Sequence, residues 1–362
     1  VLISSKESQA DEPIRISPFR LDRASEQKPS FFEIIFRLDD TSYRYGFEVT
    51  SEKVETEWLF YSPHGKETKL FIREGNDIKP SRGFKGGQAA KKLTRSNALF
   101  ISVSAQFNSE TAINVLSWFK SVGVISGLDD SGYEDFTAKK FSEDPKFRTN
   151  ILDLIKGFDV GINNVIIEQV NINDPKVFPE DMPQELKEYV IKQMKDSEGF
   201  VNFKSVHQRD CGNGKTDEIP FDMDDESEGT QKLFFLSGPI IDTLSQGKLL
   251  IIDEIEARMH TLLTRKLISM FNSEINNPNH AQLIFATQDT NLLSNKLFRR
   301  DQIWFVEKDE MGSSHLYSLA ELKVRKERDY ENDYLQGRYG GIPMLGEMRQ
   351  TMIDLIHEDE HE

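Results

Sequence analysis

A short apolar stretch that ends in two acidic residues is the feature that most constrains this chain. Leu249 to Ile252 are four consecutive apolar residues, and Asp253 and Glu254 follow them directly. A run this short and apolar is typical of a strand buried on both faces, as in the centre of a parallel sheet. Acids at the carboxyl end of such a strand lie where α/β sheets bind ligands. One acid can hold a magnesium ion while its neighbour orients or deprotonates water, although apolar strands followed by acids also occur by chance.

The length and composition limit the class of protein. A chain of 362 residues can form one large domain or two, and 37% hydrophobic with 29% charged residues is ordinary for a soluble protein. The formal net charge of −16 argues against non-specific nucleic-acid binding as the main activity. The single cysteine, Cys211, excludes an intramolecular disulfide and suits a reducing cytoplasm. No apolar run reaches membrane-spanning length, so we expect a cytoplasmic protein with no membrane partner.

Apolar periodicity divides much of the chain into expected strands and helices. Short aromatic and β-branched runs separated by turn residues predict an antiparallel meander over 30–73. Residues 97–104 fit either a strand or the start of a buried helix. The other expected elements are helices at 109–122, 141–158 and 183–196, the last of them charged and amphipathic, and strands at 164–170, 303–306 and 315–317.

Two glycine-bearing loops have to be weighed as phosphate sites. The Gly-Lys-Thr at 214–216 matches the end of a P-loop pattern, but the first glycine of that pattern would fall on Arg209. A P-loop follows a buried apolar strand and opens a helix, whereas residues 201–206 alternate. Asn-Gly between two extended runs favours a hairpin turn over a phosphate site. The loop at 85–87 lacks the Lys-Ser/Thr that a phosphate cradle needs.

Ser227 stands before an apolar, helically spaced stretch from Leu233 to Leu244. Serine suits the N-cap of a helix, and Gly229 allows another backbone to approach the first turn. A helix start with free N–H groups and a hydroxyl suits an anion such as a γ-phosphate, although an ordinary capped helix has the same features. Pro239 predicts a kink in this helix or its division in two.

A second apolar run, residues 282–287, ends in Gln288 and Asp289. We expect a helix at 261–276 between this run and the acid-tipped strand. Two buried strands joined by a helix form a right-handed βαβ unit whose strand ends share one crevice. The apolar face expected for the helix consists of Leu263, Leu267, Phe271 and Ile275.

Residues 226–230, 249–256 and 284–289, taken in order, resemble the carboxyl half of an ABC-type ATPase. The subgroup that they resemble holds AAA-class proteins related to the OLD (overcoming lysogenisation defect) and structural-maintenance-of-chromosomes (SMC) families. The aromatic region at 43–47 and the tail at 333–344 look like those of ATPase subunits of bacterial phage-defence systems, including abortive-infection and PARIS-like systems. This resemblance implies an α/β fold: an ABC-type ATPase head with a RecA-like parallel sheet, an antiparallel β-subdomain and a helical insertion.

The resemblance also implies roles for the residues at the strand ends. Asp253 would bind Mg²⁺, and Glu254 would polarise the attacking water. Gln288 replaces the family's switch histidine. A glutamine can donate a hydrogen bond to a γ-phosphate but carries no positive charge, which favours slow or partner-gated hydrolysis.

The resemblance implies that the start of the helix after Ser227 acts in the active site of a second subunit. Ser227, Gly229 and Thr230 would contact the γ-phosphate of ATP held by a partner copy. Active sites would then be complete only in a head-to-tail homodimer or a higher even oligomer.

The resemblance suggests a division of the chain into five parts. No P-loop occurs in this sequence, so either a segment that carries it lies upstream or the protein does not cradle phosphates normally; the intact acid pair favours a missing segment. The expected parts are a connector at 1–29, a β-rich part of the head at 30–108, a helical insertion at 109–200, the signature, Walker B and switch part at 201–320, and a helical tail at 321–362.

The implied function is an ATP-hydrolysing engine of a bacterial antiphage system that controls a separate effector, such as a Toprim-type nuclease, in response to a phage or nucleic-acid trigger. The alternative is a DNA-repair or chromosome-associated, SMC-like ATPase that acts directly on nucleic acid. A third hypothesis is a scaffold that does not hydrolyse ATP. Basic residues at 299–300 and 323–328 fit a solvated surface, a partner protein or nucleic acid.

Overall fold

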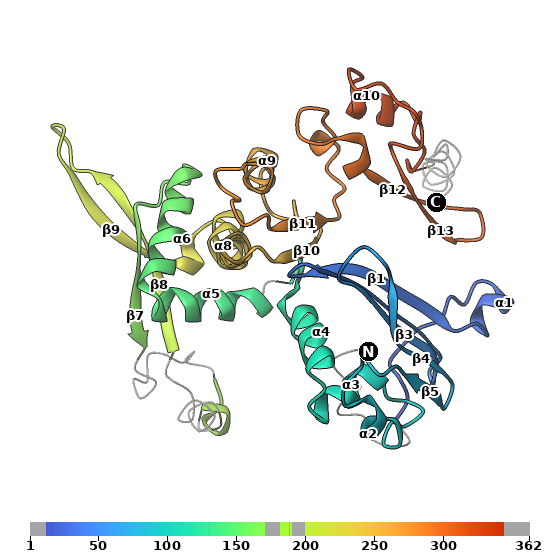
Figure 1. Cartoon of the computed structure of the whole chain (residues 1–362). Coiled ribbons are helices and arrows are strands. Elements are labelled where there is room, and N and C mark those ends of the chain that lie inside the picture. Colours follow the sequence, from blue (N-terminus) through green and yellow to red (C-terminus); the bar gives the residue numbers. More distant parts are fainter. Residues whose placement is uncertain (1–11, 130, 171–181, 188, 190–199, 344–362) are drawn as a thin grey trace, which may run out of the picture. The chain divides into compact units, whose positions relative to one another are not determined.

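The computed structural model describes residues 12–129, 131–170, 182–187, 189 and 200–343 (Figure 1). The chain divides into two compact units, one formed by Val1–Leu116 with Asn291–Glu362 and the other by Ser117–Thr290. A parallel sheet, several antiparallel sheets and helices make it a mixed α/β protein, which confirms the predicted fold class. Among the helices described, none is both long and apolar enough to cross a membrane.

An antiparallel sheet with its strands in sequence order organises the first unit, as predicted for the meander. Side chains on one face alternate into the core, among them Tyr45, Phe47 and Leu59. Phe71 packs edge-on against Phe100 with ring centroids 4.9 Å apart. The elements, which follow α1 (Arg23–Glu26), are β1 (Ser30–Leu38), β2 (Thr41–Val49), β3 (Val54–Ser62), β4 (Thr68–Glu74), β5 (Asp77–Pro80), α2 (Gly87–Lys91) and α3 (Phe100–Gln106).

A buried carboxylate fixes the start of α3 to this sheet. Glu57 on β3 accepts the backbone N–H groups of Phe100 at 2.6 Å and Ile101 at 3.0 Å. These N–H groups belong to the first turn of a helix and have no partner within it. Tyr45 donates its hydroxyl to the same carboxylate at 3.1 Å, and burial raises the pKa of Glu57. Residues 97–104 therefore contain the start of a buried helix and not a strand.

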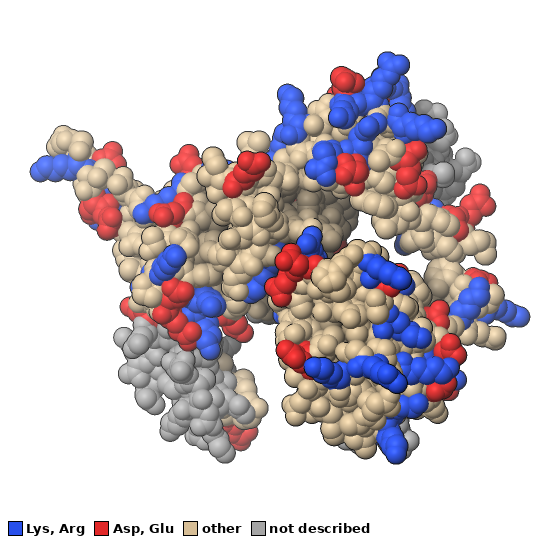
Figure 2. Space-filling model, in the orientation of Figure 1, with Lys and Arg blue, Asp and Glu red and all other residues tan. Residues whose placement is uncertain are grey.

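The carboxyl-terminal part of the first unit contains a hairpin and a short helix. The strands β12 (Trp304–Lys308) and β13 (Ser314–Ser318) confirm the two strands predicted there. The short 3₁₀ turns η4 (Thr290–Leu292) and η5 (Arg300–Gln302) precede the hairpin, and α10 (Tyr330–Leu335) follows it. On the face shown in Figure 2, lysines and arginines gather over the α10 region.

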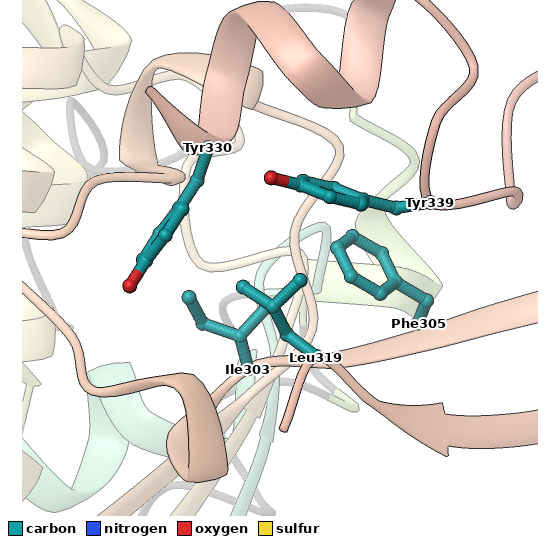
Figure 3. Close-up of a cluster of buried hydrophobic side chains, with 5 residues drawn as sticks. All are labelled: Ile303, Phe305, Leu319, Tyr330 and Tyr339. Carbon is teal, nitrogen blue, oxygen red and sulfur yellow. The ribbon is translucent and has the colours of Figure 1, made fainter. Parts of the chain in front are cut away.

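A small hydrophobic cluster holds the hairpin and α10 together. Phe305 of β12 stacks on Tyr334 of α10 with ring centroids 5.4 Å apart. Asp333 accepts hydrogen bonds from Arg328, Arg338 and the hydroxyl of Tyr339. The buried members of the cluster, drawn in Figure 3, are Ile303, Phe305, Leu319, Tyr330 and Tyr339.

A three-stranded parallel sheet forms the centre of the second unit. Its order is β11 (Gln282–Phe285), β10 (Leu249–Asp253) and β6 (Gly123–Ser126), so the acid-tipped strand lies in the middle. The helix α9 (Thr261–Phe271) joins β10 to β11, which confirms the predicted βαβ unit. The helix α8 (Glu228–Gln246) contacts β10.

The two faces of this sheet differ in burial. Leu250 and Ile252 of β10 are buried, but Ile251 between them is only half-buried. Ile251 lies in register with Val124 of β6 and Ile284 of β11, whose side chains are 74% and 56% exposed. Burial of this strand on both faces was therefore a wrong prediction for the described part of the chain. Parallel sheets are normally covered on both faces, so this row is an apolar surface that the described part of the second unit leaves exposed.

The helical predictions need two corrections. The stretch 141–158 is not one helix, because Asp144 caps a new helix start and accepts the backbone N–H of Lys146 at 2.9 Å. The helix after the acid pair ends at 271, and Ile275, expected on its apolar face, is 90% exposed. The helices observed between residues 109 and 158 are α4 (Glu110–Ser121), as predicted, α5 (Ser131–Glu143), which was not predicted, and α6 (Pro145–Gly157).

Pro239 was predicted to kink its helix or to divide it in two, and α8 is not divided. A proline lacks the N–H that would bond the carbonyl four residues earlier, here that of Phe235. The hydroxyl of Thr137, on α5, donates a hydrogen bond to this carbonyl instead. The close contact uses Gly238, where a Cβ atom would lie 2.1 Å from the Thr137 hydroxyl. A neighbouring helix thus supplies the missing donor, and α8 continues to Gln246.

An antiparallel sheet of β7 (Asn164–Val170), β8 (Phe200–Asp210) and β9 (Thr216–Asp222) completes the second unit. Gly212, Asn213 and Gly214 between β8 and β9 all have positive φ. The Gly-Lys-Thr sequence therefore lies in a hairpin turn and not in a P-loop, as predicted. A 3₁₀ turn, η3 (Met223–Asp225), leads from β9 to α8. The helix expected at 183–196 falls largely outside the described residues, of which 184–187 and 189 are helical.

Candidate active site at the tips of the parallel strands

Asp253 and Glu254 lie at the carboxyl end of the central strand. Asp253 is the last residue of β10, and its side chain is exposed. Glu254 follows with φ of +52°, a left-handed conformation that is uncommon for residues other than glycine. Such a conformation persists only where its surroundings hold it in place. The backbone around the acid pair is therefore as important as the two carboxylates.

Gly127, just after β6, supports the backbone of the acid pair. Its N–H donates a hydrogen bond of 2.6 Å to the carbonyl oxygen of Asp253. A Cβ atom at position 127 would lie 2.0 Å from the carbonyl oxygen of Glu254, so only glycine fits here. Sequence reasoning missed both Gly127 and the strand β6 before it, so the close backbone approach that a glycine permits there had no signal.

The switch position lies beside Glu254. The side-chain amide of Gln288 donates a hydrogen bond of 3.3 Å to Oε1 of Glu254. The backbone N–H of Gln288 donates to Oε1 of Glu256 at 2.7 Å, while Oε2 of Glu256 is buried and has no hydrogen-bond partner among the described residues. Glu256 thus fixes the loop after β11 to the loop after β10. Sequence reasoning assigned Glu256 no role.

Ser227 caps α8, and its side chain is exposed. Its hydroxyl oxygen accepts the backbone N–H of Thr230 at 3.2 Å, and the hydroxyl groups of the two residues lie 2.9 Å apart. Gly229 does permit a close backbone approach, because a Cβ atom there would lie 2.6 Å from the carbonyl oxygen of Arg258. The approaching backbone belongs to this chain's own loop after β10. The residues expected to contact a nucleotide thus form an ordinary helix cap whose outer face is exposed.

Lys232 is buried between the loops that surround the acid pair. It is 1% exposed, and its ammonium group donates hydrogen bonds to the carbonyl oxygens of Ala257 at 2.6 Å and Gly127 at 3.0 Å. A buried ammonium group is costly unless hydrogen-bonded, so this placement is specific. Sequence reasoning missed Lys232, although a lysine on the apolar side of an expected helix was a usable signal.

The residue before Ser227 is held by the antiparallel sheet of the same unit. Both the hydroxyl of Ser205 and Nε2 of His207, on β8, lie 2.5 Å from Oε1 of Glu226. The carbonyl oxygen of Glu226 accepts the side-chain amide of Gln231 at 2.9 Å. These contacts determine where the chain enters α8, and so where the Ser227 hydroxyl lies.

The side chains at the strand tips fit Mg²⁺ bound together with a phosphate ligand. Within the described residues, no group of three or more His, Cys, Asp or Glu side chains is placed to hold a metal ion. Mg²⁺ commonly takes only one or two carboxylates and completes its shell with waters and substrate phosphates. The exposed carboxylate of Asp253 suits that role. A cradle for the phosphates is not among these residues, because the sequence contains no P-loop pattern.

Comparisons with known proteins give one family. The model of the family described as "AAA domain, putative AbiEii toxin, Type IV TA system" matches residues 3–294. No curated protein matches the sequence. A similar solved structure is the "SmcHead bound to the C-winged helix domain of ScpA", which is 12% identical, covers 79% of this chain and 77% of its own, and has a TM-score of 0.35. A likeness of that size supports no inference about function.

Proposed function

The chain belongs to the AAA-domain family whose model matches residues 3–294, and on this premise we propose that it binds and hydrolyses ATP. One observation carries the proposal. The central parallel strand ends in Asp253 and Glu254, and Gln288 from the neighbouring strand end donates a hydrogen bond to Glu254. Ligands bind at such strand ends in α/β sheets, and an acid pair there suits phosphoryl transfer to water.

In this proposal each residue at the strand tips has its own task. Asp253 holds Mg²⁺, which neutralises phosphate charge when bound. Glu254 accepts a hydrogen bond from the attacking water and draws its proton away. Gln288 holds Oε1 of Glu254 and offers an uncharged donor. Because Gln288 cannot carry positive charge, we expect slow or partner-gated turnover.

The proposed active site is shared between two copies of the chain. The exposed hydroxyl of Ser227, with Gly229 and Thr230 at the start of α8, would meet the γ-phosphate held by a partner copy. A head-to-tail homodimer, or a higher even oligomer, completes both sites.

We expect the segment that carries the phosphate cradle to cover the exposed face of the parallel sheet. The support is that Val124 and Ile284 are exposed and Ile251 between them is only half-buried, since parallel strands are normally buried on both faces. In this arrangement the cradle lies at the same strand ends as Asp253 and Glu254. The whole is then an ABC-type ATPase head.

The biological setting that we propose is bacterial antiphage defence in the cytoplasm. The family description names a putative toxin of a type IV toxin–antitoxin system, and the motifs resemble those of OLD-like and PARIS-like ATPases. In this role ATP turnover controls a separately encoded effector, such as a Toprim-type nuclease, after a phage trigger. Loss of phage protection with Glu254→Gln in a host that carries the complete system would support this setting, and retained protection would contradict it.

Steady-state ATP turnover by the full-length protein, with and without Glu254→Gln, tests the proposed chemistry. Removal of a general base costs about 10²–10⁴-fold in rate, so the variant should be nearly inactive. Equal turnover by both proteins would overturn the proposal.

Mixing two inactive variants tests the shared site. Ser227→Ala and Glu254→Gln should each have little activity alone. A mixed dimer has one site with both defects and one with neither, so mixing should restore up to about half of the activity of a wild-type dimer. No recovery in a preparation shown to contain mixed dimers would contradict a site built from two chains.

Direct action on nucleic acid is the second candidate function. A basic surface on a loop that hydrogen bonds hold in place favours it. Lys323, Arg325 and Lys326 are exposed in a chain of net charge −16. Asn295 fixes their loop by donating to the carbonyl oxygens of Lys326 at 3.1 Å and Arg328 at 3.0 Å. If these three cations contact phosphates, replacing them with alanine should lower the salt dependence of DNA binding by about three counter-ions. Unchanged salt dependence would contradict this candidate.

A further inference from the structure

Lys232 connects the start of α8 to the loops that hold Glu254. We propose that Lys232 is a positioning residue that couples the two active sites of a dimer, by linking the nucleotide contact of Ser227 in one site to Glu254 in the other. The inference rests on the proposed function, because it needs a head-to-tail dimer in which Ser227 and Glu254 of one chain serve different nucleotides.

The first connection runs through Gly127. The ammonium group of Lys232 donates to the Gly127 carbonyl at 3.0 Å, and the Gly127 N–H donates to the Asp253 carbonyl at 2.6 Å. Gly127 lies so close to the acid pair that a Cβ atom would be 2.0 Å from the Glu254 carbonyl oxygen. A shift of Gly127 must therefore move the backbone of Glu254.

The second connection runs through Ala257. Lys232 donates to the Ala257 carbonyl at 2.6 Å, and the Ala257 N–H closes a turn by donating to the Glu254 carbonyl at 3.1 Å. Each connection thus consists of two hydrogen bonds, the first ending at the carbonyl of the Asp253–Glu254 peptide bond and the second at the Glu254 carbonyl. Glu254 has a left-handed backbone, so its conformation depends on contacts of this kind.

Burial makes this link stiff. The Lys232 side chain is 1% exposed, and hydrogen bonds from a charged donor are stronger than those between neutral groups. Ser227 lies five residues earlier, about 7.5 Å along the helix axis. The Gly229 contact with the Arg258 carbonyl leaves little room for sliding between α8 and the loop. A movement of the α8 start on contact with the partner's nucleotide is therefore transmitted to Glu254.

The test compares Lys232→Met and Lys232→Gln with Leu236→Val in the full-length protein. Leu236 is a buried apolar residue of α8, four positions after Lys232, so its variant controls for loss of helix packing. ATP turnover is measured against ATP concentration, together with ATP affinity and thermal stability. We expect Lys232→Met to lower kcat about tenfold or more with ATP affinity changed less than about threefold. Lys232→Gln, which keeps a neutral donor, should fall between Lys232→Met and wild type.

Cooperativity separates coupling from simple support of the fold. Wild type should show a Hill coefficient above one, and both Lys232 variants should approach one, whereas Leu236→Val should keep the wild-type value. A folded Lys232 variant with wild-type kcat and Hill coefficient would overturn the inference, as would cooperativity lost equally in Leu236→Val or absent in an active wild type. Wild-type turnover no higher than that of Glu254→Gln would instead overturn the proposed function itself.

Discussion

The side-chain amide of Gln288 donates a hydrogen bond of 3.3 Å to Oε1 of Glu254, from 34 positions further along the chain. The two residues meet because β10 and β11 are parallel neighbours, so their carboxyl ends lie at one edge of the sheet. Gln288 offers Glu254 a neutral donor, so the local charge does not change with pH through this residue.

Replacing Gln288 with histidine should introduce a new pH dependence. An unperturbed histidine titrates near about pH 6.5, and its protonated form adds a positive charge next to the site of phosphoryl transfer. We expect kcat of Gln288→His to rise as the pH falls through this range, measured as a pH profile of ATP turnover. Gln288→Ala is the control. Its turnover should be slower than that of the wild type at all pH values and should not show the rise expected for Gln288→His. Identical profiles for Gln288→His and Gln288→Ala would contradict this placement of residue 288.

Gly127→Ala should disturb the acid pair, because a Cβ atom would lie 2.0 Å from the carbonyl oxygen of Glu254. Relief of such a clash requires backbone movement and costs about 1–3 kcal/mol. The matched control is Gly132→Ala, since a Cβ atom at Gly132, within α5, meets nothing within 4 Å. That change should be neutral or stabilise by about 0.5–1 kcal/mol, because alanine is the better helix former. Chemical denaturation measures both values, and equal effects would contradict the close approach at Gly127.

Much of the second unit could be predicted from local pattern. The apolar run at 249–252 is long enough to specify a strand, and the helical period after 261 specifies the return to a parallel neighbour. The turn at 212–214 followed from its Asn-Gly signal. These features depend on residues adjacent in sequence, which is why they were readable.

The contacts that hold the acid pair could not be read in the same way. Lys232 and Gly127 are 105 positions apart, and only the fold brings the ammonium group to that carbonyl. The exposed face of the parallel sheet was also unpredictable, since isoleucine and valine, as at Ile284 and Val124, are typical of buried strands. Periodicity reports which side chains suit a core but not whether a given chain supplies the cover.

Thr137→Val should destabilise the fold, because Pro239 removes one backbone hydrogen bond from α8 that the Thr137 hydroxyl replaces. The Thr137 hydroxyl donates to the Phe235 carbonyl, which Pro239 leaves without its helical partner. Removal of this donor leaves a carbonyl unpaired, at a cost of about 1–3 kcal/mol in the free energy of unfolding. Pro239→Ala restores a backbone N–H for Phe235, so Thr137→Val should cost less in that background. A double-mutant cycle by denaturation measures the difference. Additive effects would contradict the conclusion that the Thr137 hydroxyl replaces the backbone N–H that Pro239 lacks.

Asp333 should make the carboxyl-terminal cluster sensitive to acid. The hydrogen bond from Arg328 is the main cause that holds the pKa of Asp333 below its ordinary value of 3.8, and Tyr339 adds to it. The Asp333 residue is 4% exposed. A lowered pKa means that the ionised group stabilises the fold above pH 3.8, and that this contribution is lost as the pH falls through the lowered value.

The measurement is amide exchange in α10 and β12 between pH 7 and pH 3. Asp333→Asn should reduce the protection of these amides from exchange at pH 7. It should also make that protection fall less in acid, because the asparagine has no charge to lose. Asp301→Asn is the control: Asp301 pairs with Arg299, but both side chains are more than half exposed, and exposed ion pairs contribute about 0–1 kcal/mol. Equal effects of the two substitutions would show that burial adds nothing at Asp333. A larger effect at Asp333 identifies its carboxylate as the group that joins α10 to the loops on either side of it.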